Sequence, residues 1–165
     1  MKAFAAGGGL LLVLVLSVPL LFVAGGGSSA AAATVSTRSG PPVTTALAPV
    51  FDDVPPGGFP GAGRFPYGQC TWWAAFNRNV SWNGNGGDWL LNAAAKGYAT
   101  SATPQYKSIV VYPAGRGYSQ YGHVGVVVAV TPTSYTVSEM NYQGLGVVDQ
   151  RTVAWPDPVV EGFIL

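Results

Sequence analysis

Apolar and polar positions along this chain of 165 residues follow three successive patterns. Residues 10–24 form a nearly continuous apolar run, apolar residues recur at helical spacing from position 70, and from position 108 they alternate as in strands. Asp88 and Gly97 are the expected N-cap and end of a second helix. The pattern predicts helices over 70–78 and 89–96 and strands over 108–112, 123–130, 135–141, 147–153 and 162–165. Helices followed by consecutive strands indicate an α+β fold, with N-terminal helices packed on an antiparallel β-sheet.

The apolar run at 10–24 follows a short positive start, Met1 and Lys2, and small residues follow it at 25–33. This layout is typical of a signal peptide or of an uncleaved N-terminal membrane anchor. The run is short for a span of about 20 residues, and a buried core helix is disfavoured at this place in the chain. We therefore expect residues 1–30 to be a signal peptide or anchor. The rest of the protein is then secreted or held on the outer side of the cytoplasmic membrane.

Residues 31–63 are rich in Gly, Pro, Ala and Thr, and we interpret them as a semi-extended linker. The remaining residues 64–165 contain all five tryptophans of the chain. About 100 residues are enough for one small domain and too few for two. The sequence therefore predicts a single globular domain behind a leader and a linker.

Charge excludes some partners. The chain has eight basic and seven acidic residues, and the two numbers become equal once Lys2 is set aside with the leader. Basic residues are scattered and form no stripe that would neutralise a phosphate backbone, so nucleic acid is not an expected partner. Asp52, Asp53 and Asp88 lack the spacing of a calcium loop, and we expect no metal and no cofactor. A monomer acting on a substrate rich in sugar or peptide fits this composition better.

Cys70 is the only cysteine and stands at the start of the first predicted helix. Free backbone N–H groups and the helix dipole favour a thiolate at such a position. A single cysteine in an exported protein also has no partner for an intrachain disulfide, as a catalytic thiol requires. The alternative is that Cys70 is simply a small buried apolar residue.

His123 is the only histidine and begins the predicted strand 123–130. The following strand places Val137, Glu139 and Asn141 on one face, and a hairpin through residues 131–134 would bring Glu139 or Asn141 near His123. A cysteine, a histidine and a carboxylate or amide are the parts of a site for nucleophilic acyl transfer. Alternatively, His123 is a structural residue at a strand end, and the polar pair belongs to a solvated strand face.

Three motifs occur in one order: YGQCTWWAAFNRN at 67–79, GHVGVVVAV at 122–130 and YTVSEMNYQG at 135–144. Together they resemble the CHAP family of cysteine, histidine-dependent amidohydrolases and peptidases, whose fold is papain-like. The resemblance extends over about 65–165 and includes WLLNAAAKGY and the closing GFIL. It implies that the protein hydrolyses an amide bond in the peptide part of bacterial peptidoglycan.

By motif position the resemblance implies that Cys70 is the nucleophile and His123 the general base. Glu139 matches the residue that orients the imidazole, and Asn141 matches a further polar member of the site. We favour Glu139 over Asn141 for orientation because a carboxylate stabilises an imidazolium better than an amide does. One departure concerns Lys107, which with Ser108 stands where the family has Gly or Gly-Asp, so the shape of that turn is open.

Three further residues are expected at the substrate. The Gln69 side chain, with backbone N–H groups at the helix start, would bind the oxyanion. Tyr67 and Trp73 are expected at the cleft, whereas Trp72 is expected in the core.

The sequence does not decide which bond is cut. The alternatives are the amide between N-acetylmuramic acid and L-alanine and an amide of the stem or cross-bridge. An accessory wall-binding module of a secretion or conjugation apparatus is the alternative function, although both Cys70 and His123 are present.

Overall fold

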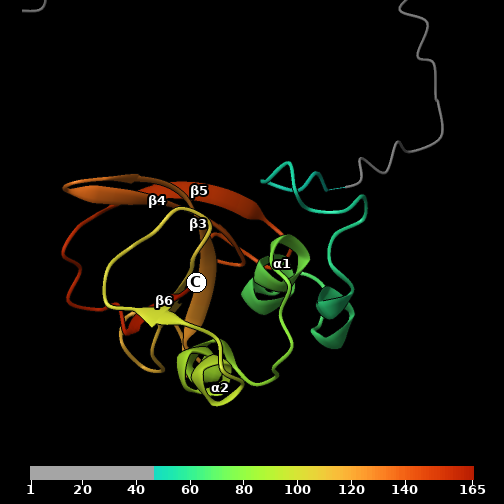
Figure 1. Cartoon of the computed structure of the whole chain (residues 1–165), viewed down its shortest axis with the longest axis horizontal. Coiled ribbons are helices and arrows are strands. Elements are labelled where there is room, and N and C mark those ends of the chain that lie inside the picture. Colours follow the sequence, from blue (N-terminus) through green and yellow to red (C-terminus); the bar gives the residue numbers. More distant parts are fainter. Residues whose placement is uncertain (1–46) are drawn as a thin grey trace, which may run out of the picture. The chain divides into compact units, whose positions relative to one another are not determined.

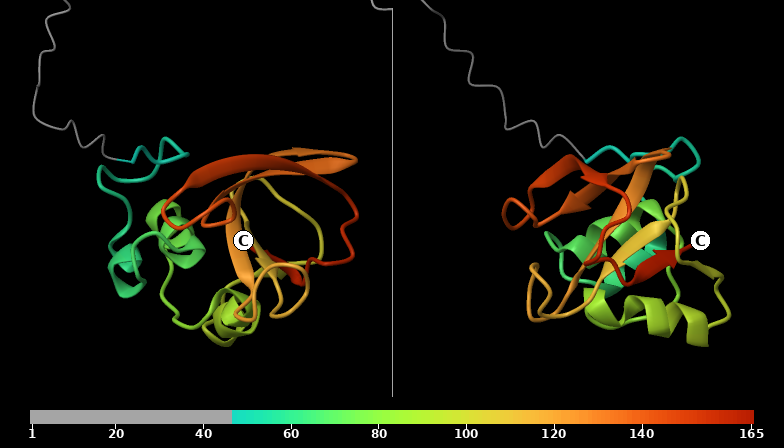
Figure 2. Two further views of the ribbon diagram at one scale, coloured as in Figure 1. Left: turned by 180° about the vertical axis from the view of Figure 1, so that it is seen from behind. Right: turned by 90° about the vertical axis from the view of Figure 1, so that its left-hand side faces the viewer.

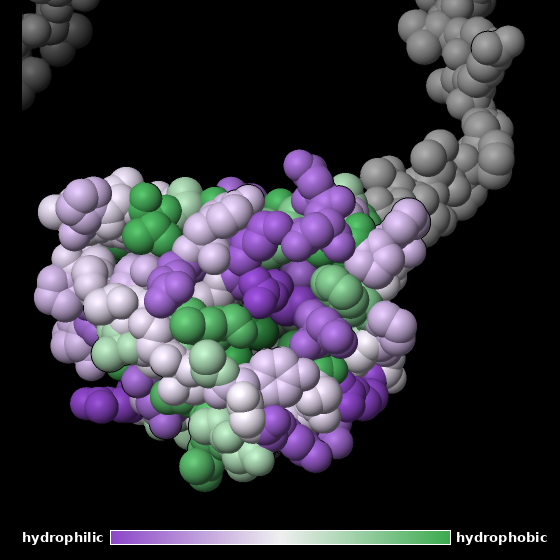
Figure 3. Space-filling view, in the orientation of Figure 1, coloured by the Kyte–Doolittle hydropathy of each residue, from purple (hydrophilic) through white to green (hydrophobic). Residues whose placement is uncertain are grey.

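A computed structural model of the protein describes residues 47–165. The leader predicted for residues 1–30 and the first part of the predicted linker lie outside these residues. Between positions 47 and 165, no helix is long and apolar enough to span a membrane. On the face shown in Figure 3, hydrophilic and hydrophobic residues are interspersed.

The core of the fold is a six-stranded antiparallel sheet with the order β1-β6-β2-β3-β4-β5. It curves strongly, as the two views of Figure 2 show. The strands are β1 (Thr100–Ser101), β2 (Ile109–Tyr112), β3 (His123–Thr131), β4 (Ser134–Met140), β5 (Val148–Ala154) and β6 (Gly162–Ile164). Five of them were predicted to within two residues at each end. The two-residue β1 was not, since so short a strand has no readable period.

Two α-helices precede the sheet, α1 (Cys70–Asn77) and α2 (Trp89–Ala95), each next to a short 3₁₀ helix, η1 (Pro60–Arg64) or η2 (Gly86–Asp88). Figure 1 shows α1 and α2 at separate places against the sheet. α2 ends as predicted, because Gly97 follows it with φ of +84°, a conformation that glycine adopts without steric cost. The predicted α+β fold, with helices before an antiparallel sheet, is thus confirmed.

Alternation along the strands gives the sheet two apolar clusters. One contains Trp73 and Phe76 of α1 together with Val124 and Val126 of β3. Residues Val110, Tyr112, Val127, Tyr135, Val137 and Phe163 form the other cluster. The alternation along β3 holds as far as Val127, and a bulge between Val127 and Ala129 shifts the register to β4.

Residues 47–63, which the sequence analysis assigned to the linker, pack against α1. Phe51 is 3% exposed and belongs to the core with Val54 and Ala62. Backbone hydrogen bonds reinforce this packing, because the Phe59 N–H donates to the carbonyl of Phe76. Isolated apolar residues between glycines and prolines have no helical or strand period, which is why this segment was not recognised as part of the domain.

The turn before β2, where Lys107 departs from the family pattern, retains the backbone shape that glycine would favour. Lys107 has φ of +68°, in the left-handed region. Its N–H donates to the carbonyl of Val127, and its carbonyl accepts from the guanidinium of Arg78. Its ammonium group also lies 2.7 Å from a carboxylate oxygen of Asp53. These contacts hold the lysine in a conformation that is uncommon for it.

We predict that Phe51→Ala lowers the free energy of unfolding by about 3 kcal/mol, because a buried aromatic ring is replaced by a cavity. Urea unfolding followed by tryptophan fluorescence measures the change. Leu91→Ala is the control, since Leu91 is 74% exposed and should change stability by less than about 0.5 kcal/mol. An equally small effect at Phe51 would contradict the packing of residues 47–63 on the domain.

Candidate active site

The start of α1 places the thiol. Cys70 is the first residue of α1 and Gln69 is its N-cap, with φ of −94° and ψ of 156°. The thiol is free and buried, and it lines the wall of a cavity together with His123. The helix start is where free backbone N–H groups point outward, so negative charge on the sulfur or beside it is stabilised there.

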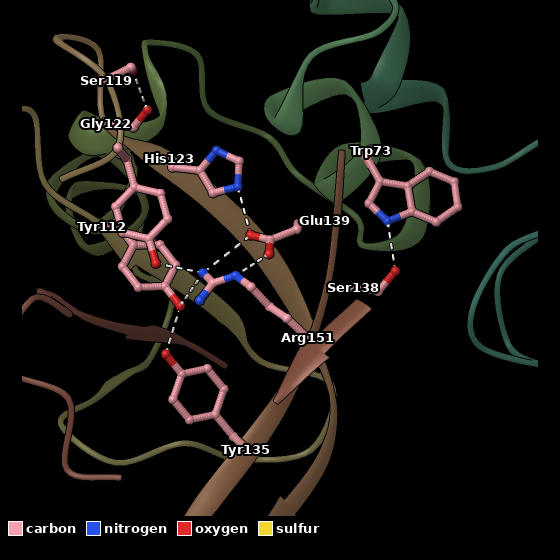
Figure 4. Close-up of polar contacts among 10 residues, drawn as sticks. Trp73, Tyr112, Ser119, Gly122, His123, Tyr135, Ser138, Glu139 and Arg151 are labelled. Carbon is pink, nitrogen blue, oxygen red and sulfur yellow. Dashed lines mark hydrogen bonds and ion pairs between the residues drawn. The ribbon is translucent and has the colours of Figure 1, made fainter. Parts of the chain in front are cut away.

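His123 is fixed by its place at the start of β3. It pairs with Tyr112 of β2 in the sheet register and is 5% exposed. Its Nε2 lies 2.8 Å from Oε2 of Glu139, which comes from β4 (Figure 4). Gly125 allows this approach, because a Cβ atom there would lie 2.4 Å from Cγ2 of Val137 and 3.1 Å from Cβ of Glu139.

Burial and the two neighbours act in opposite directions on the charge of His123. Burial disfavours the imidazolium, but interactions with Cys70 and then Glu139 outweigh it and raise the pKa of His123 to about 9. The imidazole is therefore protonated at neutral pH. The pKa of His123 lies above the ordinary value of 6.5, so protonation of its imidazole stabilises the folded state. This contribution to stability is fully present below about pH 6.5 and is lost as the pH rises through about 9.

The structure also brings to the site two residues that the sequence analysis missed. Arg151 of β5 donates from Nε to Oε1 of Glu139, and from Nη2 to the hydroxyl of Tyr112 at 3.1 Å (Figure 4). Tyr118, from the loop before β3, stacks on His123 with ring centroids 5.2 Å apart and an interplanar angle of 12°. The only sequence signal for Arg151 was a charged residue within a predicted strand.

Asn141 contacts Gln69 and has no hydrogen bond to His123. Its Nδ2 donates to Oε1 of Gln69 at 2.9 Å. Asn141 directly follows β4 with φ of +65°, a left-handed conformation that asparagine tolerates better than most residues. Of the two candidates for the partner of His123, the hydrogen-bonded one is Glu139.

The structure corrects the expectation for Trp73, which does not lie at the cleft. Trp73 is 1% exposed, stacks on Phe76, and donates its indole N–H to Oγ of Ser138. Trp72 is the less buried of the two neighbouring tryptophans. Tyr67 is exposed and packs edge-on against Trp72, with centroids 4.8 Å apart, outside the set of residues that line the cavity.

The cavity in front of Cys70 has a volume of about 900 Å³. None of its lining residues is Asp, Glu, Lys or Arg, and the thiol of Cys70 and the imidazole of His123 are its reactive groups. Amide and hydroxyl side chains provide its other polar groups, from Gln69, Thr71, Asn85, Tyr118, Ser119, Tyr121, Asn141, Tyr142 and Gln143. Residues 47–165 contain no group of three or more His, Cys, Asp or Glu placed to hold a metal ion. The geometry suits the binding of a polar, extended substrate beside a thiol and an imidazole.

Comparison with known proteins gives a consistent result. Residues 60–141 match the family model described as the CHAP domain, which confirms the resemblance seen in the sequence. Over 101 residues the chain is 39% identical to "Probable autolysin LDP" of Staphylococcus aureus, covering 56% of this chain and 34% of the relative. A "Putative hydrolase" of Streptococcus mutans is 39% identical over 102 residues, covering 57% and 44% of the two chains.

A solved structure shares the same fold. The crystal structure of an N-acetylmuramoyl-L-alanine amidase from Staphylococcus aureus superposes with a TM-score of 0.52 at 32% identity. The match covers 62% of this chain and 31% of that chain. The protein thus spans less than half the length of these relatives.

We predict that the imidazole of His123 titrates with a midpoint near pH 9 in the folded protein, and that Glu139→Gln or Cys70→Ala moves the midpoint toward 6.5. Proton NMR can follow this directly, because the chain has a single histidine. Unfolding in urea provides the control and should return the midpoint to about 6.5. A midpoint near 6.5 in the folded wild type would show that Cys70 and Glu139 do no more than offset the burial of the imidazole.

Proposed function

We propose that this chain, whose residues 60–141 belong to the CHAP domain family, is a cysteine hydrolase that cleaves an amide bond in the peptide part of peptidoglycan. The observation that carries the proposal is that Cys70 and His123 line one cavity and that the buried Glu139 is hydrogen-bonded to His123. The names of the relatives, an autolysin and an N-acetylmuramoyl-L-alanine amidase, support peptidoglycan as the substrate. The bond is either the amide between muramic acid and L-alanine or an amide of the stem or cross-bridge.

In this proposal Cys70 and His123 react as a thiolate and an imidazolium. Because Nε2 of His123 is bound to Glu139, the proton that reacts is the one on Nδ1. The sulfur forms a bond to the substrate carbonyl carbon, and the carbonyl electron pair moves onto oxygen. The C–N bond then breaks as the imidazolium protonates the leaving nitrogen. A thioester and a free amine result.

Hydrolysis of the thioester uses the same two groups in reverse. The neutral imidazole takes a proton from water, and the hydroxide formed adds to the thioester carbon. When the C–S bond breaks, Cys70 leaves as the thiolate beside the restored imidazolium of His123. Each cycle therefore consumes one water and returns the ion pair to its starting state.

Gln69 and the N–H groups at the start of α1 are the proposed oxyanion donors. The side-chain oxygen Oε1 of Gln69 accepts a hydrogen bond from Asn141. The side-chain nitrogen Nε2 of Gln69 therefore remains as the donor to the oxyanion. This arrangement gives Asn141 a role distinct from that of Glu139. Asn141 fixes the amide of Gln69, while Glu139 holds the imidazole of His123.

The proposed location follows from the sequence. We propose that residues 1–30 direct the protein out of the cytoplasm as a signal peptide or anchor. The names of the relatives, an autolysin and an N-acetylmuramoyl-L-alanine amidase, are consistent with an enzyme that acts in the cell envelope.

The first test is digestion of purified peptidoglycan with residues 47–165, a fragment that retains Phe51 and Val54 in the core. Mass spectrometry of the products should show muropeptides with a new free amine at one defined position, and Cys70→Ala should yield none. The mass of the products identifies the bond. If the folded, reduced wild type gives no products from walls of several peptide types, the hydrolase proposal fails and a wall-binding module replaces it.

We predict that Gln69→Ala lowers kcat by about 10²–10³-fold, the range found when one oxyanion donor is removed. Asn141→Ala should lower kcat less, since the Gln69 amide stays but loses its fixed orientation. Release of muropeptides over a substrate range measures kcat and KM separately. Gln150→Ala is the control, because Gln150 is an exposed glutamine on β5. If kcat of Gln69→Ala equals that of the wild type, the oxyanion is bound elsewhere.

A further inference from the structure

We propose that Arg151 is a positioning residue of the active site, which holds Glu139 in the orientation and charge state that His123 requires. The inference rests on the proposed function. It begins from the sheet order, in which β2, β3, β4 and β5 are successive neighbours. These strands contribute Tyr112, His123, Glu139 and Arg151, so that side chains from four neighbouring strands meet in one cluster (Figure 4).

The carboxylate of Glu139 has no exposed surface, and both of its oxygens have hydrogen-bond partners. His123 bonds Oε2, while Nε of Arg151 bonds Oε1 and its Nη2 lies 3.5 Å from Oε2. A guanidinium is a planar fork that matches the plane of a carboxylate. Arg151 therefore fixes the rotation of the Glu139 carboxylate about its terminal bond. This rotation decides whether Oε2 faces the imidazole.

The charge of Arg151 matters at one stage of the reaction. While His123 is protonated, it neutralises Glu139. After His123 gives its proton to the leaving group, Glu139 would be a buried anion without a counterion if Arg151 were absent. Such an unpaired buried charge costs several kcal/mol. Arg151 remains charged throughout, because a guanidinium does not release its proton in this pH range. It thereby allows His123 to become neutral without forcing Glu139 to take up a proton.

Arg151 is itself held from several sides, unlike a surface cation. Its Nη2 donates to the hydroxyls of Tyr112 and Tyr118. The guanidinium carbon lies 5.4 Å from the ring centroids of both tyrosines and 4.6 Å from that of Tyr142. Since the ring of Tyr118 also stacks on His123, the same aromatic group constrains the imidazole and the arginine. A side chain held in this way can transmit a fixed geometry to Glu139.

Three variants test the proposal. Arg151→Leu removes both the fork and the charge, and Arg151→Lys keeps the charge but not the fork. Tyr118→Phe keeps the ring on His123 and removes only the hydroxyl that accepts from Arg151. Lys96→Leu is the matched control, because it removes a cation from the exposed end of α2. The readouts are kcat and KM for muropeptide release, the rate of Cys70 alkylation by iodoacetamide, and the urea midpoint as a check of folding.

We expect Arg151→Leu to lower kcat by about 100-fold with KM unchanged, the size of effect that a small misplacement of a reacting group produces. Alkylation of Cys70 should slow as well, since a poorly held imidazolium stabilises the thiolate less. Arg151→Lys should recover part of the kcat, and Tyr118→Phe should show a smaller loss of kcat than Arg151→Leu. Lys96→Leu should match the wild type in every readout.

Wild-type kcat and alkylation rate in folded Arg151→Leu would overturn the proposal, and so would a rise in KM without a fall in kcat. If Arg151→Leu does not fold, Arg151→Lys and Tyr118→Phe decide, and wild-type kcat in both would overturn it. Alkylation needs no peptidoglycan, so it separates this proposal from the proposed function. If the wild type leaves peptidoglycan intact but Arg151→Leu still slows the alkylation of Cys70, only the proposed hydrolase function is refuted.

Discussion

The buried carboxylate of Glu139 is the constraint on which the arrangement of the site depends. It has no exposed surface and lies between an imidazole and a guanidinium, each within hydrogen-bond reach. A buried charge is tolerated only with such partners, because desolvation costs several kcal/mol per ion. The sheet order brings the partners from the strands on either side of β4, and Gly125 leaves the space in which the Glu139 side chain reaches the first of them. Removing either neighbour would leave the carboxylate half compensated.

The thiol of Cys70 comes from a different part of the chain, so its distance from His123 and Glu139 depends on how α1 packs on the sheet. Trp73 has a central part in that packing, three residues after Cys70 and on the same helix. Its indole N–H donates to Ser138, which directly precedes Glu139 in β4. The contact therefore joins the helix of the cysteine to the strand of the glutamate. This explains why a bulky aromatic beside the cysteine is buried, although its neighbourhood suggested a place at the cleft.

Local patterns in the sequence were enough to place five of the six strands, both helices, Cys70 and His123, because periodicity and helix ends are short-range properties. Trp73 was misplaced because almost every residue of α1 is buried, so no single apolar face could be recognised in eight residues. Arg151 was missed for another reason. Which residue of β5 lies diagonal to Glu139 depends on the register of two strands, with Val137 opposite Arg151, and a sequence without its fold does not specify that register. Phe51 and Val54 were assigned to the linker because isolated apolar residues among glycines and prolines form no helical or strand period, and their tertiary contacts cannot be recognised from the sequence.

In the proposed mechanism the charges of Cys70, His123, Glu139 and Arg151 alternate in sign: thiolate, imidazolium, carboxylate, guanidinium. The four sum to zero, which allows them to be buried together beside a cavity that Asp, Glu, Lys and Arg do not line. After His123 gives up its proton and the thiolate becomes a thioester, the remaining pair, Glu139 and Arg151, still sums to zero. In this mechanism the reaction moves charge among these four groups without changing their total. A buried site with low dielectric would oppose any step that left a net charge behind, so in the proposed mechanism Arg151 is the group that makes a neutral His123 accessible during turnover.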